Sequence, residues 1–166
     1  MESRLRRLVV MPALAGLVVA LAAGLVWIRT DIAEARTAQE EREAALRAAG
    51  VHAVSRLSLH HRTVDDDIRR ALSTSTGEAR SELAAEAAKL KQAAIDTRAI
   101  QTGVVRAAGL VSMNAELTSA DVLVVADALL RWEGGRPAPQ DRYYRWRMRV
   151  SKVGGAWLVS KAEQVS

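Results

Sequence analysis

An uncharged run at residues 8–28 is the sequence feature that most restricts how this chain can fold. Its 21 residues, LVVMPALAGLVVALAAGLVWI, would span about 30 Å as a helix, which is the thickness of the hydrocarbon core of a bilayer. Three arginines precede the run, whereas Asp31 and Glu34 follow it. By the positive-inside rule, we expect a cytoplasmic basic tail at residues 1–7, a transmembrane helix at residues 8–28, and an extracytoplasmic remainder.

A cleaved signal peptide is the alternative interpretation of this run, because Ala20-Leu21-Ala22 resembles a small-x-small cleavage site. The apolar regions of signal peptides usually have about 7 to 15 residues, so the greater length favours a retained anchor in the cell membrane. Both interpretations export the rest of the chain. The chain contains no Cys, which excludes disulfides and thiolate metal sites, so the exported part must be stabilised by its core alone.

The anchor is followed by a predicted helical stalk at residues 29–45 and a predicted α+β domain at residues 46–166. Residues 31–60 contain no Pro, a single Gly, and many Ala, Glu, Arg and Gln residues, a composition typical of a helix. One apolar face is expected at Leu46, Gly50, Val54 and Leu57, which are spaced four, four and three residues apart. This spacing places the four residues on one face of the helix.

Two further helices are predicted from capping-box patterns, in which Ser or Thr is followed three residues later by Asp or Glu. The pattern at residues 63–66 predicts a short helix that carries Ile68 and Leu72 inward. The pattern at residues 75–78 predicts a longer helix that ends near Arg98. The expected apolar stripe of this longer helix consists of Leu83, Ala87, Leu90 and Ala94.

Four strands are predicted at residues 100–112, 120–132, 143–153 and 156–165, the last two joined by a Gly154-Gly155 hairpin turn. Alternation in the middle strands places Val122, Val124, Ala126, Ala128, Leu130, Trp132, Tyr144, Trp146, Met148 and Val150 on inward faces. Because the chain has no Phe, we expect Trp132, Trp146 and Trp157 to fill the core. The fold class is therefore α+β, with about three helices packed on a curved antiparallel sheet of about four strands.

Several segments together resemble the Mce-associated (mammalian-cell-entry-associated) membrane proteins of actinobacteria. They read HRTVDDDIRRALSTSTGEARSELAAEAAKLK, TGVVRAAGLVS, DVLVVADALLRW and RYYRWRMRVSKVGGAWLVS, and the resemblance covers roughly residues 35–165. It implies a nuclear-transport-factor-two-like cone and a non-enzymatic accessory subunit that stabilises or assembles a lipid-import complex. The family carries over no catalytic residues. Inner-membrane assembly proteins of type IV secretion have the same order of anchor, stalk and domain, so a secretion scaffold is the alternative.

The histidines His52, His60 and His61 and the acidic residues 65–67 form the candidate cluster for metal binding or catalysis. Adjacent histidines on a helix point about 100° apart, and acidic residues in a first helical turn are stabilised by the helix dipole without an ion. We therefore expect no catalytic, cofactor-binding or metal-ligating residues. The enzymatic alternative is a small-ligand isomerase or cyclase that uses His60 or His61 with Asp65.

Positive charge is concentrated at residues 131–153, where seven basic residues stand against two acidic ones. Arg145, Arg147 and Arg149 lie on the face of their strand that is opposite the apolar residues. They are either a solvated face or an interface for an acidic protein or anionic lipid headgroups. We expect no nucleic-acid partner, because the predicted topology places this segment outside the cytoplasm.

Overall fold

The computed structural model describes residues 29, 32–134 and 137–165. The predicted basic tail and transmembrane helix, residues 1–28, lie outside the described residues. Within the described ranges, no helix is both long and apolar enough to cross a membrane. The chain divides into two compact units, Met1–Glu40 and Glu41–Ser166. In the first unit, residues 32–40 are helical and mostly exposed.

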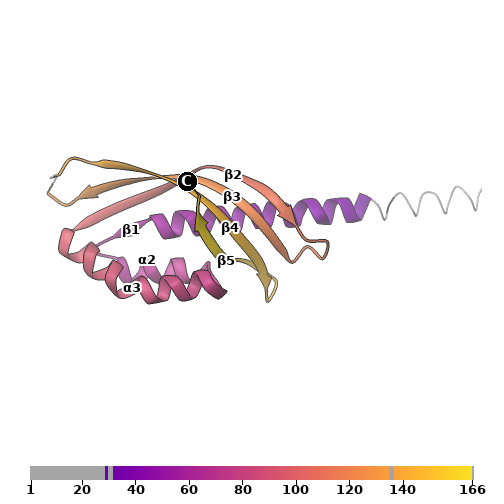
Figure 1. The fold of residues 1–166 in the computed structure, drawn as a ribbon, viewed down its shortest axis with the longest axis horizontal. Coiled ribbons are helices and arrows are strands. Elements are labelled where there is room, and N and C mark those ends of the chain that lie inside the picture. Colours follow the sequence, from indigo (N-terminus) through magenta and orange to yellow (C-terminus); the bar gives the residue numbers. More distant parts are fainter. Residues whose placement is uncertain (1–28, 30–31, 135–136, 166) are drawn as a thin grey trace, which may run out of the picture. The chain divides into compact units, whose positions relative to one another are not determined.

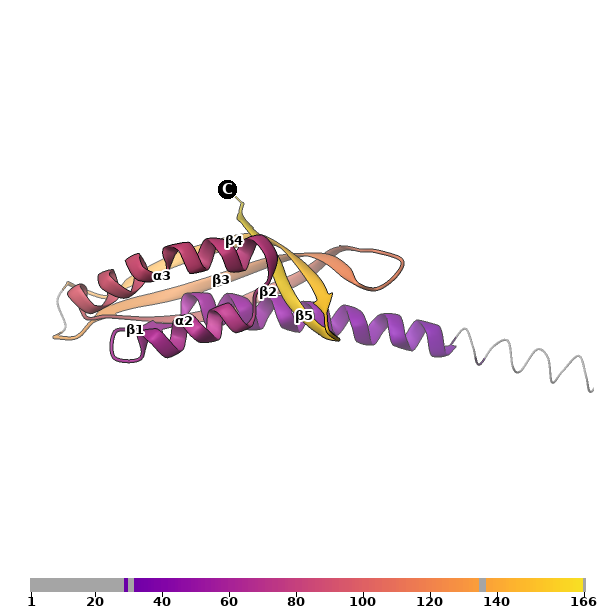
Figure 2. The ribbon, with the colours of Figure 1, turned by 90° about the horizontal axis from the view of Figure 1, so that it is seen from below.

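The second unit is a five-stranded antiparallel sheet with helices on one face (Figures 1 and 2). Its first helical segment comprises residues 41–57. The remaining elements are β1 (Leu59–His60), α2 (Val64–Ser73), α3 (Gly77–Thr97), β2 (Ala99–Met113), β3 (Ser119–Trp132), β4 (Gln140–Val153) and β5 (Ala156–Gln164). The strands lie in the order β1-β2-β3-β4-β5, which confirms the predicted helices on an antiparallel sheet. The sequence predicted four strands, and the additional one is β1, which is two residues long and too short to show a period in the sequence.

The core lies between the helices and the inward residues of the strands. On β3 and β4, the alternation is as predicted, with Val122, Val124, Ala126, Ala128, Met148 and Val150 all buried. Gly154 and Gly155 both have positive φ angles, as the two-residue hairpin between β4 and β5 requires. Because the side-chain period of a strand is two, this register leaves the other set of side chains on the face away from the helices.

The inward face of the first helical segment differs from the predicted one. Its buried apolar residues are Ala45, Ala49 and Ala53, followed by Leu57, whereas Val54 is 38% exposed. The prediction of Leu57 is confirmed, whereas the predicted Leu46, Gly50 and Val54 each lie one position after a buried alanine. Alanines are buried instead because the segment lies close to the sheet. At its end, Leu57 leaves no room for a side chain at Gly103 of β2.

The capping boxes predicted the helix starts but not the bonds that hold them. Thr63 is the N-cap of α2, but its hydroxyl donates to the Asp67 carboxylate at 3.0 Å instead of accepting from a backbone amide. The N-cap of α3 is Thr76, one residue after the predicted Ser75, and its side chain makes no capping bond. The longer helix ends at Thr97, as predicted, and its C-cap has a left-handed backbone.

The prediction that three tryptophans fill the core holds for one of them. Trp146 is 7% exposed and belongs to the main cluster, whereas Trp132 and Trp157 are half-buried. Trp157 donates its indole N–H to Glu41 at 2.7 Å, and Lys152 donates to the same carboxylate at 2.5 Å. These two hydrogen bonds hold the pKa of Glu41 below its usual value and tie the helical segment to the hairpin of β4 and β5.

Candidate functional site on the outer face of the sheet

The histidine and aspartate candidates are separated by their own partners. His60 and His61 stack on each other at 4.7 Å, and His61 contacts Glu133 at 2.8 Å. Asp65 instead forms an ion pair with Lys91 at 2.8 Å. The structure therefore does not bring either histidine to Asp65, and the described part of the chain holds no group of three His, Cys, Asp or Glu residues placed to bind a metal ion.

His52 is the one histidine that is fully buried among the described residues, with 1% of its surface exposed. Its Nδ1 lies 2.8 Å from the hydroxyl of Thr74, which itself donates to the carbonyl of Ala71. The ring therefore donates and the hydroxyl accepts. Burial, assisted by the charge of Arg56, lowers the pKa of His52 from 6.5 to about 4. His52 is therefore a neutral packing residue at physiological pH.

We expect the domain to lose stability between pH 6.5 and about 4, because the unfolded state binds a proton at His52 that the folded state excludes. This contribution is fully present above pH 6.5 and decreases on acidification, by about 3 kcal/mol in total. Denaturant titrations of wild type and His52→Gln at pH 7.0 and 4.5 test it. The variant should lose much less stability on acidification; equal losses would show that His52 is accessible to protons in the folded state.

The outer face of the sheet, opposite the helices, presents polar, charged and apolar side chains together. Leu123 and Val125 of β3 are 46% and 40% exposed, and Tyr143 of β4 is 74% exposed. Arg145, Arg147 and Arg149 are exposed on the same face, as the alternation of β4 predicted. By contrast, the inward positions of the same strands carry Ala, Val, Met and Trp side chains. The outer face is therefore the better candidate for a functional surface.

The three arginines of this face have different electrostatic environments. Arg149 is neutralised by Asp121, whose carboxylate lies 3.0 Å from its Nε, and this pairing raises the pKa of Arg149. Arg147 lies opposite Leu123 on one side and Glu163 on the other. Arg145 lies opposite Val125. The predicted row of three equivalent cations is therefore a pair, Arg145 and Arg147, beside one neutralised arginine.

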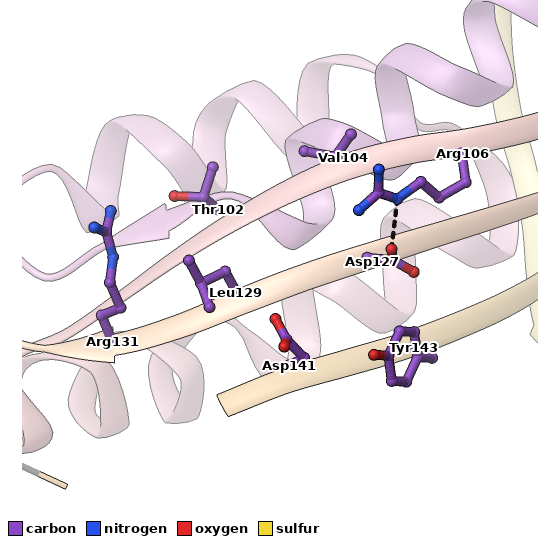
Figure 3. Close-up of a pocket in the computed structure, with 8 residues that line it drawn as sticks. All are labelled: Thr102, Val104, Arg106, Asp127, Leu129, Arg131, Asp141 and Tyr143. Atoms are coloured by element: carbon purple, nitrogen blue, oxygen red, sulfur yellow. Dashed lines mark hydrogen bonds and ion pairs between the residues drawn. The ribbon is translucent and has the colours of Figure 1, made fainter. Parts of the chain in front are cut away.

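A hollow of about 350 Å³ lies at one end of the outer face (Figure 3). Its lining residues come from three adjacent strands: Thr102, Val104, Arg106, Asp127, Leu129, Arg131, Asp141 and Tyr143. Arg106 donates to Asp127 at 2.5 Å across the hollow. Sequence reasoning missed this hollow, although the alternation of the two central strands already placed Asp127, Leu129 and Tyr143 on the outer face.

The sequence matches a protein family over almost its whole length. The family described as "Uncharacterized protein Rv1363c/MT1408-like" matches residues 6–166. The protein "Uncharacterized protein Rv1363c" of Mycobacterium tuberculosis is 30% identical over 130 residues, which cover 78% of this chain and 49% of that protein. The chain therefore spans about half the length of the curated relative that it matches.

Solved structures with the same fold include a type IV secretion system protein and the periplasmic domain of another protein. An IcmL-like type IV secretion system protein from Legionella pneumophila has a TM-score of 0.61 and 9% identity, covering 75% of this chain and 94% of its own. The periplasmic domain of DotI has a TM-score of 0.61 and 14% identity, with coverages of 74% and 94%. At such identities the likeness shows the fold alone, which is a nuclear-transport-factor-two-like cone.

Proposed function

This chain belongs to the Rv1363c/MT1408-like family, and we propose that it is a single-pass membrane accessory subunit that acts by docking. Its extracytoplasmic domain stabilises or assembles an Mce-type lipid-import complex and carries out no chemistry of its own. The observation that carries this proposal is the contrast between the two faces of the sheet. Apolar side chains fill the inward face, whereas the outer face presents exposed apolar and cationic side chains.

The location outside the cytoplasm is supported by residues 8–28 and the arginines that precede them. A periplasmic domain of the same fold, that of DotI, is consistent with this location. The choice of an Mce-type complex rests on the resemblance of the sequence segments. A small-ligand isomerase or cyclase is less well supported, because Asp65 is paired with Lys91 and not with a histidine.

A type IV secretion assembly scaffold is the second candidate, and the fold shared with the IcmL-like protein and DotI favours it. Purification of the tagged full-length chain from native membranes, followed by mass spectrometry, separates the two. Recovery of a transporter permease and Mce proteins supports the lipid-import complex. Recovery of secretion ATPases supports the scaffold, and recovery of the chain alone would contradict both.

The topology gives a separate prediction. We expect a reporter that is active only in the cytoplasm to be silent when it is fused after Ser166, because three arginines hold the N-terminal side of the apolar run in the cytoplasm. A reporter that is active only outside the cytoplasm, fused at the same position, is the matched control and should be active. The opposite pattern would contradict the proposed location.

A further inference from the structure

An apolar strip crosses the middle of the outer face, and the strand register defines its borders. Its centre is Leu123 and Val125 of β3, both of which are at least 40% exposed. On β2, these residues pair with Gly109 and Ala107. Glycine has no side chain and alanine has a small one, so no large side chain borders the strip on that side. On β4, Leu123 and Val125 face Arg147 and Arg145. The strip therefore offers exposed apolar surface with two guanidinium groups along a single side.

These two arginines are available to a partner. Across the described ranges, no carboxylate lies within ion-pairing distance of Arg145 or Arg147, although Arg149 on the same strand is paired with Asp121. The nearest acid on β5 is Glu163, which lies opposite Arg147 but forms its ion pair with Lys161 at 2.8 Å. Lys161 lowers the pKa of Glu163 most, and the charge of Arg147 adds to this without an ion pair, so within the described residues the positive charge of Arg145 and Arg147 is incompletely balanced.

The spacing of these groups indicates what they can bind. Arg145 and Arg147 are two residues apart on one strand, a separation of about 6.6 Å. Two carboxylates one turn apart on a helix are separated by about 5 to 6 Å, so a single segment can reach both guanidinium groups. An apolar side chain between those carboxylates would then lie over Leu123 and Val125.

The rest of the outer face favours a protein over a membrane surface. Four carboxylates share the face with the arginines: Asp121, Asp127, Asp141 and Glu163. Three of these carboxylates are ion-paired, with Arg149, Arg106 and Lys161, so a broad anionic bilayer would meet mostly balanced charge. A narrow segment placed on the strip meets the two arginines that no described carboxylate pairs. Charge complementarity therefore selects a narrow acidic ligand.

We propose that the apolar strip docks an acidic segment of a partner protein, with one apolar side chain over Leu123 and Val125 and two carboxylates on Arg145 and Arg147. This inference rests on the proposed docking function and names the partner chemistry for it. Because the strip lies on the face away from the helices, docking requires no opening of the core.

Photo-crosslinking in native membranes tests the proposal with the full-length chain. Benzoylphenylalanine at Ala107, which is exposed beside Val125, reports what lies on the strip. We expect an adduct with a partner segment that carries two Asp or Glu residues within about one helical turn of the captured residue. Arg145→Ser with Arg147→Ser should lower the adduct yield about fivefold to tenfold, as expected for two exposed ion pairs.

The matched control is Arg142→Ser, on the same strand and exposed but of the opposite parity, which should leave the yield unchanged. Equal melting temperatures establish that all variants fold. Lipid adducts alone, an adduct with a second copy, a captured segment without two acids, an unchanged yield or no adduct would each overturn the proposal. If the tagged chain still co-purifies with its assembly in these cases, the docking function stands and only the assignment to the strip fails.

Discussion

Replacement of Trp146 by Ala is expected to lower the free energy of unfolding by about 3 to 5 kcal/mol, because a large buried side chain is lost and a cavity is left behind. Trp146 is 7% exposed, stacks on Tyr144 at 5.2 Å and belongs to the cluster that joins the sheet to the helical segment. The free energy of unfolding of a folded domain is typically about 5 to 15 kcal/mol, so this change would remove a large part of it. Thermal unfolding of the detergent-solubilised chain should show a decrease of roughly 10 °C.

Tyr143→Ala provides the matched control for this change. Tyr143 is also aromatic and lies on β4, but it is 74% exposed on the outer face. Its replacement should change the free energy of unfolding by about 0.5 kcal/mol or less. If the two variants melt at the same temperature, the assignment of inward and outward faces on β4 is wrong, and the proposed docking surface is lost with it.

The second large effect is expected at Gly103, where the helical segment approaches β2. A Cβ atom at this position would clash with the Cβ of Leu57 and lie 3.2 Å from its carbonyl carbon. Because backbone atoms of the helical segment are involved, the clash cannot be relieved by a side-chain rotation. Gly103→Ala should therefore lower the free energy of unfolding by about 1 to 3 kcal/mol, measured by denaturant titration.

Gly109→Ala is the control, on the same strand and with no atom within 4 Å of the position of the added Cβ. It should leave stability unchanged or raise it by up to about 1 kcal/mol, because alanine restricts the unfolded chain. Equal destabilisation by the two substitutions would show that the effect comes from strand backbone and not from the contact with Leu57.

The strands were predictable because one face of a half-buried strand alternates strictly. Val122, Val124 and Met148 are where a period of two places them, since every inward residue meets the same core. The first helical segment was harder to predict because close packing on the sheet selects small residues. Ala45, Ala49 and Ala53 are buried in preference to Val54, although alanine gives a weak signal in a sequence rich in alanine.

The candidate site was predictable in its orientation and not in its electrostatics. The alternation of β4 placed Arg145, Arg147 and Arg149 on the outer face, which is where they lie. The neutralisation of Arg149 depends on Asp121, which is 28 residues earlier in the chain and adjacent only through the register of β3 and β4. Pairings of this kind cannot be read from spacing along one strand.

This chain is proposed to act by docking through the outer face of its sheet. The most direct test is the yield of co-purified partner as a function of ionic strength, for wild type and for the triple variant Arg145→Ser, Arg147→Ser, Arg149→Ser. Exposed charges are screened within about 8 Å at physiological salt, so added salt should lower the wild-type yield towards that of the variant. Full recovery of partners by a folded triple variant at both low and high salt would contradict the claim and leave these arginines as a solvated face.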